Sequence, residues 1–329
     1  MSLGLRGLGG RGLMVKPDQS PGLRNPLMSA NGGDTGGIFV QTAVYFDFVS
    51  SGTAYTGRTC TATAPHNDTW IIEGANRGLN PGNVTYTGNK TLRFNLDPAA
   101  SLTAFSCTTN TLAGVFPDIS NCTALTSFDI GTNAITGTIC NLDKLTVLQS
   151  FACASNPGLG GAFPSLTRNI ALLTIAARSC AFTGAPPSIA TCTLIQTVDI
   201  ALNAFTGAIP AFGANTVLTS YNCRTCATLS GDIPSLSGCT ALASFFAYDN
   251  AITGVAAGFA VAAALHDFEA QNNLLTQAAV DAILAAFVLA GATGAYTLNV
   301  GGTGNAAPSL AGAADKSTLQ GRGWAVTTN

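Results

Sequence analysis

Histidine is scarce in this sequence, which limits the chemistry that its side chains can do. Only His66 and His266 occur among the 329 residues. His266 is followed by Asp267 and Glu269, and a histidine beside carboxylates can bind a metal ion or transfer protons. The same residues also suit an ordinary polar face at the end of a strand. The second interpretation is favoured because isolated groups of this kind are common on protein surfaces.

Motifs of nucleophilic, zinc or nucleotide sites are absent from the sequence, including G-x-S-x-G, H-E-x-x-H and the Walker loop. Charged residues make up only 9%, against roughly 25% in an average domain, and the net charge is −2. No basic patch indicates nucleic-acid binding, and the apolar runs are too short or too interrupted to span a membrane. We therefore predict a protein that is not an enzyme and needs no metal or cofactor.

Ten cysteines raise the question of disulfides or zinc, but their spacing follows a repeat. No group of cysteines that share a repeat position falls in adjacent repeats, so most are predicted to be free, buried thiols. Cys223 and Cys226 form the only C-x-x-C, and a zinc site needs a second pair. Cys60 and Cys140 stand outside the pattern and are candidates for cross-links to a partner.

The element that positions these residues is a phrase repeated eight times between residues 102 and 276, with a period of 23 or 24 residues. It reads L-x-x-F-x-x-x-x-N-x-[LIF]-T-G-x-[IF]-P, and such a regular period indicates a solenoid. Alternating apolar residues at its start predict a short strand with inward side chains. The ninth position predicts an inward side chain that satisfies buried backbone groups, and it holds Asn110, Asn133, Asn156, Cys180, Asn203, Cys226, Asn250 and Asn273.

This phrase resembles the leucine-rich repeat of the L-x-G-x-I-P subtype known from plant receptors and inhibitors. The resemblance implies an α/β solenoid with one parallel β-sheet and an irregular or 3-10 convex side. Around the repeats (97–276), the sequence predicts an extended Gly-rich arm (1–37), an N-terminal β module that caps the first coil (38–96) and an α/β C-terminal cap (277–329). In this cap, helices are predicted over residues 278–289 and 310–320.

Two further resemblances suggest a biological setting. The ending, NVGGTGNAAPS followed by STLQGRGWAVTTN, resembles the close of leucine-rich-repeat proteins of tailed bacteriophages. The Gly-rich opening is similar to virion proteins whose N-terminal arms dock to the particle. Together they imply a virion protein made in the bacterial host cytoplasm. The arm residues expected to make the anchoring contacts are Leu5, Arg6, Arg11, Leu13, Met14, Arg24 and Leu27.

The outward strand positions offer a candidate binding surface. They are mostly small in the first three repeats and carry larger groups later, namely Arg178, Asp199, Arg224, Phe246, Tyr248, Asp249, His266, Asp267 and Glu269. Aromatic rings flanked by carboxylates suit either a host-surface glycan or a protein.

Three functions are therefore open. The first is a structural protein of the virion, of the capsid-decoration or minor-capsid type, which contacts other virion proteins. The second is a tail or collar fibre that recognises a host surface glycan or protein, and the third is a secreted leucine-rich-repeat receptor or inhibitor. A homo-oligomer is expected, with a trimer as the form that phage appendages usually take.

Overall fold

The computed structural model describes residues 102–226 and 228–329 in full and, before them, the backbone of six strands. These six are β1 (Val44–Ser50), β2 (Arg58–Thr63), β3 (Thr69–Ile72), β4 (Ala75–Gly78), β5 (Asn83–Tyr86) and β6 (Thr91–Leu96). The predicted anchoring arm, residues 1–37, lies outside the described residues.

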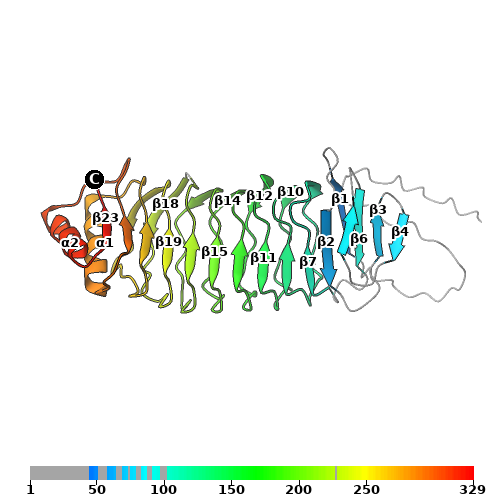
Figure 1. The fold of residues 1–329 in the computed structure, drawn as a ribbon, viewed down its shortest axis with the longest axis horizontal. Coiled ribbons are helices and arrows are strands. Elements are labelled where there is room, and N and C mark those ends of the chain that lie inside the picture. Colours follow the sequence, from blue (N-terminus) through cyan, green and yellow to red (C-terminus); the bar gives the residue numbers. More distant parts are fainter. Residues whose placement is uncertain are drawn as a thin grey trace, which may run out of the picture. The chain divides into compact units, whose positions relative to one another are not determined.

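Each of the eight repeats contributes one short strand to a parallel sheet that we call the main sheet. These strands are β7 (Ala104–Ser106), β9 (Ser127–Asp129), β11 (Ser150–Ala152), β13 (Thr174–Ala176), β15 (Thr197–Asp199), β17 (Ser220–Asn222), β19 (Ser244–Phe246) and β21 (Asp267–Glu269). They pair in chain order without a register shift, so equivalent repeat positions are neighbours. The predicted solenoid is confirmed, and Figure 1 shows its strands side by side.

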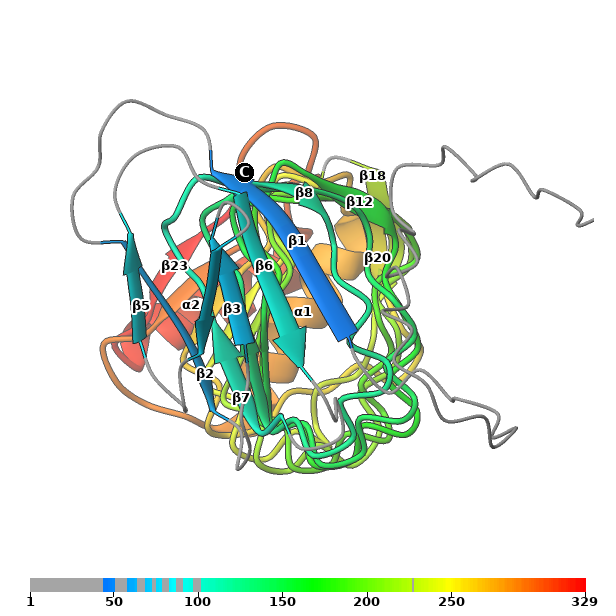
Figure 2. The same cartoon turned by 90° about the vertical axis from the view of Figure 1, so that its right-hand side faces the viewer.

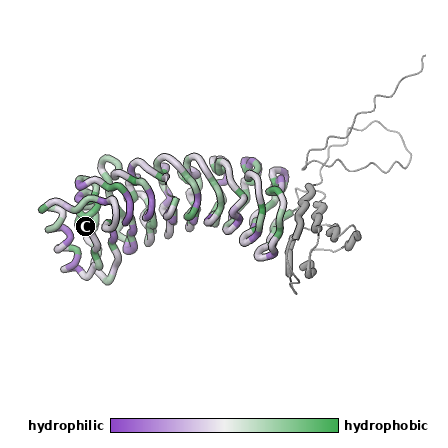
Figure 3. Tube along the Cα trace, turned by 90° about the horizontal axis from the view of Figure 1, so that it is seen from above, coloured by the Kyte–Doolittle hydropathy of each residue, from purple (hydrophilic) through white to green (hydrophobic). Residues whose placement is uncertain are grey.

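The fourth repeat position supplies the centre of the core. Its side chain is buried in every coil, while the residues on either side of it face outward. Figure 3 shows the resulting alternation of hydrophobic and hydrophilic residues along each coil. The Phe245 ring stacks on Tyr221 at 5.9 Å and on Phe268 at 5.4 Å between centroids. A second stack joins Phe128 to Phe105 and to Phe151 at 5.5 and 5.9 Å.

In the first seven coils the chain after the inward asparagine is more regular than the resemblance implied. Its L-T-G segment, on the side expected to be irregular or 3-10, forms a second parallel sheet. The strands are β8 (Leu112–Val115), β10 (Ala134–Thr138), β12 (Gly158–Ala162), β14 (Ala181–Gly184), β16 (Ala204–Gly207), β18 (Thr228–Ile233) and β20 (Ala251–Val255). Gly184 and Gly207 have φ of 73° and 76°, a region that a side chain disfavours. The rest of the return leg consists of turns, and Figure 2 shows successive coils overlaying one another.

The ninth-position asparagines join neighbouring coils through hydrogen bonds. The Asn133 Oδ1 atom accepts from the backbone N–H groups of Asn110 and Leu112, both at 3.0 Å. Its Nδ2 atom donates to the Cys107 carbonyl at 2.7 Å and the Ile130 carbonyl at 2.9 Å. One side chain therefore satisfies backbone groups of two coils that the bend would otherwise leave unpaired.

Cysteine replaces asparagine in two coils and does only part of this work. The Cys180 Sγ atom donates to the Cys153 carbonyl at 3.3 Å, and Cys226 Sγ lies 3.7 Å from the Ile200 carbonyl. A thiol is a weak donor and has no amide oxygen to accept in return. These coils therefore keep the inward position filled with fewer hydrogen bonds.

The eighth repeat position has an unusual backbone in every coil. Its residues have φ between 53° and 58° although none is glycine: Thr109, Thr132, Ser155, Ser179, Leu202, Thr225, Asp249 and Asn272. This left-handed conformation costs such residues of order 1 kcal/mol or more. It directs each N–H to a carbonyl of the following coil, as in the 2.7 Å bond from Ser155 to Arg178. The bond between coils offsets the strain.

Different elements continue the sheets at the two ends of the repeats. At the N-terminal end, β1 pairs antiparallel with β8, and β2 pairs antiparallel with β7. At the other end come α1 (Gln277–Ala290), β22 (Thr297–Asn299), α2 (Leu310–Gly321) and β23 (Ala325–Thr327), and both strands extend the main sheet. Among the described residues, no helix is long and apolar enough to cross a membrane.

Candidate interaction surface

The outward face of the main sheet changes character along the stack. Ser150 and Ala152 are typical of the first three coils, where these positions are small except for Asp129 in the second coil. In later coils the register aligns Asp199, Asn222, Phe246 and Glu269 in one row across four neighbouring strands. The side chains of this row are half-buried. We call the part of the face on β17, β19 and β21 the late-coil face.

The structure brings most of the predicted surface residues together, but not all. Arg178 follows β13, and β15 separates it from β17, the first strand of the late-coil face. Asp249 lies in the turn after β19, where its carboxylate accepts from Asn272 Nδ2 at 2.8 Å. Its role is therefore partly to hold two adjacent turns together.

A cation already occupies part of the late-coil face. The Arg224 guanidinium lies over the Tyr248 ring, 5.4 Å from its centroid. These residues share the seventh repeat position in adjacent coils, because Asn222 and Phe246 two residues earlier are register partners. A guanidinium over an aromatic face is attracted by the ring quadrupole. The pair keeps both side chains spread over the sheet.

Two carboxylates of the late-coil face, Asp267 and Glu269, lie on β21. Removal from water raises the pKa of Asp267, Glu269 raises it further, and His266 opposes the shift. Gln271 Nε2 donates to Glu269 Oε2 at 3.1 Å, while the Gln271 Oε1 atom is buried without a hydrogen-bond partner. The surface therefore has more acceptors than donors at this point.

His266 is an aromatic contact as well as a neighbour of carboxylates. Its ring lies 5.4 Å from that of Tyr296, which meets Trp324 edge-on at 5.1 Å. Trp324 Nε1 in turn donates to the Ala292 carbonyl at 3.1 Å. Within the described residues, no three His, Cys, Asp or Glu side chains are grouped as a metal site would require. The contact with Tyr296 connects His266 to the C-terminal cap.

Sequence reasoning missed four residues of this surface. Asn222 and Gln271 occupy the same fifth and seventh positions as residues that were predicted, so counting along the repeat could have found them. Tyr296 and Asn299 could not be found this way, since α1 separates them from the last repeat. Only the pairing of β22 with β21 places them next to it.

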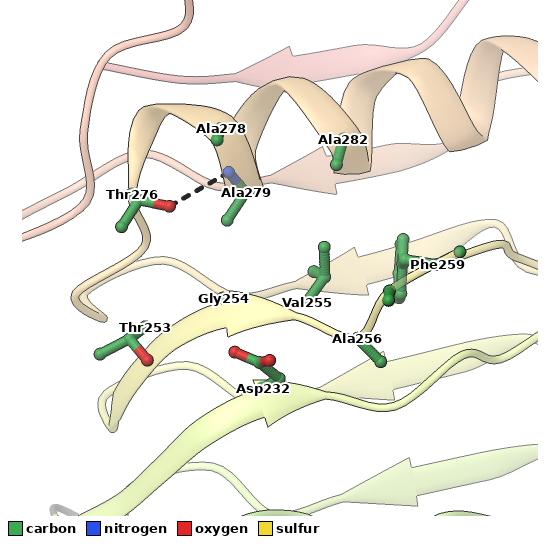
Figure 4. A pocket seen from close by; sticks show the side chains of 12 residues that line it. Asp232, Thr253, Gly254, Val255, Ala256, Phe259, Thr276, Ala278, Ala279 and Ala282 are labelled. Carbon is green, nitrogen blue, oxygen red and sulfur yellow. Dashed lines mark hydrogen bonds between the residues drawn. The ribbon is translucent and has the colours of Figure 1, made fainter.

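A separate hollow of about 640 Å³ lies between β20 and the start of α1. It forms where the second sheet ends, because α1 takes the place of another return leg. Figure 4 shows small side chains on both walls, including Ala256 and Ala282, with the Asp232 carboxylate on the strand side. Thr276 caps α1 at this end by accepting from the Ala279 N–H at 3.2 Å. The walls of this hollow are mainly apolar.

The cysteines are mostly free thiols, with one correction. Eight are free in the described part of the chain, including Cys140. Cys107, which we expected to be a free thiol, is disulfide-bonded. The prediction compared cysteines of neighbouring coils only, whereas β2, outside the repeats, pairs with β7 just before Cys107. For Cys60, in β2, only the backbone is described, so the predicted cross-link there remains a prediction.

We expect the buried thiols to make stability fall at alkaline pH. The pKa of Cys122 is raised from an ordinary value near 9 to about 12. Burial is the largest cause, and Cys140 and Asp118 nearby contribute to the rise. The folded state keeps this proton where the unfolded state loses it, so stability is complete below pH 9 and declines as pH rises toward 12. One such thiol lowers the free energy of unfolding by up to about 1.4 kcal/mol per pH unit.

Urea unfolding at several pH values above 9 measures this effect. Other groups titrate in the same range, so the wild type is compared with Cys122→Ala, whose decline should be shallower. Equal slopes for the two proteins would mean that Cys122 ionises alike in both states.

Comparisons with known proteins concern the coils. No protein-family model matches the chain. No curated protein matches it either. Among solved structures, the leucine-rich-repeat ectodomain of the receptor kinase GASSHO1/SCHENGEN3 from Arabidopsis thaliana is 26% identical over 54% of this chain, with a TM-score of 0.49. A TDR receptor is 20% identical over 55% (TM-score 0.47), and the functional domain of InlJ from Listeria monocytogenes is 18% identical over 63% (TM-score 0.41).

The chain spans only part of these proteins, 22%, 32% and 50% of their respective lengths. The repeat phrase, the register of the main sheet and the asparagine bonds between coils together establish the fold as a leucine-rich-repeat solenoid.

Proposed function

We propose that this chain is a non-enzymatic structural protein of a bacteriophage particle, of the capsid-decoration or minor-capsid type, whose solenoid binds another virion protein. The observation that carries the binding role is the late-coil face. Phe246, Tyr248 and Arg224 are half-buried there, on a sheet whose first coils display small residues. Aromatic residues and arginine are enriched where proteins bind one another, and they dominate the binding energy.

The virion setting rests on sequence. The Gly-rich opening and the C-terminal ending resemble phage virion proteins, and residues 1–37 are proposed to anchor the chain to the particle. Eight free thiols suit a protein that folds in a reducing cytoplasm such as that of a bacterial host.

Immunogold electron microscopy of intact particles tests the setting, with antibody raised against residues 102–276. We expect gold over the heads, and loss of gold when residues 1–37 are deleted. Gold confined to tails or collars would instead support a receptor-binding fibre. Unlabelled particles would contradict the virion setting and leave the binding role to be judged on its own.

The binding role has a separate test. Combining Phe246→Ala with Tyr248→Ala should reduce incorporation into particles at least about tenfold, since hot-spot residues contribute 2 kcal/mol or more each. Gln149→Ala changes an exposed side chain in an early coil and should leave incorporation unchanged. Normal incorporation with lost adsorption to host cells would favour glycan or receptor recognition.

One observation favours a second candidate, a secreted leucine-rich-repeat receptor or inhibitor. Cys107 is disulfide-bonded at the N-terminal end of the repeats, and disulfides persist mainly in oxidising compartments. This candidate predicts sugar on Asn121, an exposed residue in an N-x-T sequon. Mass spectrometry of the native protein separates the two, because a virion protein made in bacterial cytoplasm should carry a bare Asn121.

A further inference from the structure

Two carboxylates stand side by side on the late-coil face, with His266 next to Asp267. Asp267 and Glu269 begin and end β21, and Phe268 between them points into the core with 0% exposure. Alternate residues of a strand share a face, so both carboxylates point outward, with Cα atoms about 7 Å apart. Among the residues that the structure describes, neither has an ion-pair partner, and both are half-buried.

Gln271 adds an acceptor to the same strip. Its Nε2 atom donates a hydrogen bond to Glu269 Oε2 at 3.1 Å, which fixes the orientation of the amide group. The remaining Oε1 atom is buried and has no hydrogen-bond partner. A buried acceptor left unpaired is unfavourable, so a donor that reached it would be bound favourably.

Aromatic rings border these acceptors on both sides. Phe246 is the register partner of Glu269 on β19, and Tyr296 lies directly before Thr297, the register partner of Asp267 on β22. Tyr248 on the β19 side already holds the Arg224 guanidinium over its ring. A planar cation bound in this strip would therefore have both carboxylates and aromatic side chains as neighbours.

We propose that the strip formed by Phe246, Tyr248, Asp267, Glu269 and Gln271 binds an arginine side chain of the partner protein. This inference rests on the proposed binding role and names the chemistry of the partner. Charge decides in favour of a cation, because the late-coil face carries three carboxylates, Asp249, Asp267 and Glu269, against the Arg224 guanidinium and the His266 imidazole. Arginine fits better than lysine, since its five donors lie in one plane and reach several acceptors while the plane stacks on a ring.

Selection from a library of random short peptides displayed on yeast tests the proposal, with the full-length protein as bait. We expect arginine to be enriched among the binders. In the strongest binder, replacing arginine with its neutral isostere citrulline should weaken binding at least about tenfold, as expected for the loss of a charge-assisted hydrogen bond.

Protein variants locate the contact. Glu269→Gln and Asp267→Asn keep the side-chain volume and should each weaken the arginine peptide about tenfold. Asp129→Asn is the matched control, because Asp129 holds the fifth repeat position of the second coil, equivalent to Glu269, and already accepts from the Gly131 N–H at 2.9 Å. It should leave the affinity unchanged.

Two outcomes would overturn the proposal, and only the first of them leaves the proposed binding role intact. Binders that lack arginine, tolerate both carboxylate variants and are lost on Phe246→Ala would remove the arginine site and keep protein binding by the late-coil face. Binders insensitive to all of these variants would remove both the arginine site and the binding role.

Discussion

Phe245→Ala is expected to lower the free energy of unfolding by about 3 to 5 kcal/mol, the usual cost of removing a phenylalanine from a packed core. The Phe245 ring is fully buried, stacked between Tyr221 and Phe268 and met edge-on by Phe212 at 6.4 Å. The neighbouring coils are fixed by their own hydrogen bonds and cannot collapse into the space. Urea unfolding followed by circular dichroism measures the loss.

The next residue in the chain provides the control. Phe246 has the same side chain on the same strand but faces outward and is half-buried. Phe246→Ala should cost about 1 kcal/mol or less, because truncation there leaves no closed cavity. Similar losses for the two variants would show that the inward stack contributes no more to stability than the exposed face.

Asn156→Ala is also expected to be strongly destabilising, with a loss of about 2 to 4 kcal/mol, because a buried N–H loses its partner, two buried carbonyls each lose a donor and the amide leaves a cavity. Asn156 is fully buried in the third coil. Its Oδ1 atom accepts from the Ile135 N–H at 2.9 Å, and its Nδ2 atom donates to the Ile130 and Cys153 carbonyls at 3.0 and 2.8 Å. Alanine leaves the Ile135 N–H unpaired and removes one of two donors from each carbonyl, because Ile130 still accepts from Asn133 Nδ2 and Cys153 from Cys180 Sγ.

The chain itself suggests the intermediate variant. Cys180 and Cys226 occupy the equivalent position in other coils, so Asn156→Cys should lose less than Asn156→Ala, since the thiol fills the space and donates weakly to a carbonyl. Asn121→Ala is the exposed control, where one hydrogen bond to Lys144 is lost at the surface. If Asn156→Ala unfolds at the same urea concentration as Asn121→Ala, the inward asparagines do not stabilise the stack.

The sequence was most informative where one residue type has one role in every coil. Apolar residues at the first and fourth positions recur at a fixed period, and this period predicted where the eight main-sheet strands of the repeats lie and which side of each strand is buried. Asn133 could be assigned an inward role because an amide can satisfy several backbone groups at once. Repetition makes such inferences robust, since a chance pattern does not recur in eight coils.

Features that depend on pairing between coils were not visible in the same way. The segments of the second sheet are short and contain glycine, so nothing in their composition separates a strand from a turn. The left-handed backbone at Leu202 is equally hidden, because leucine does not favour positive φ and adopts it here for the bond from its N–H to the Arg224 carbonyl, 3.0 Å away.

The candidate surface was predicted as far as the repeat extends. Phe246, Tyr248 and Glu269 follow from counting outward positions. Tyr296 lies beyond α1, where counting fails, although it borders the same strip. The disulfide at Cys107 was missed for a related reason, since Cys107 follows β7, which pairs with β2, a strand that precedes the repeat. Sequence periodicity describes the interior of a repeat array better than its ends.

The eighth-position N–H groups also make coils interchangeable. Each coil offers its successor the same donor and accepts the same bond from its predecessor, so a duplicated or deleted coil would preserve every type of contact at the new junction. Such a change would alter mainly the reach of the exposed face, by about 4.8 Å per coil. The number of coils therefore determines the length of the exposed face and can vary without changes to the core.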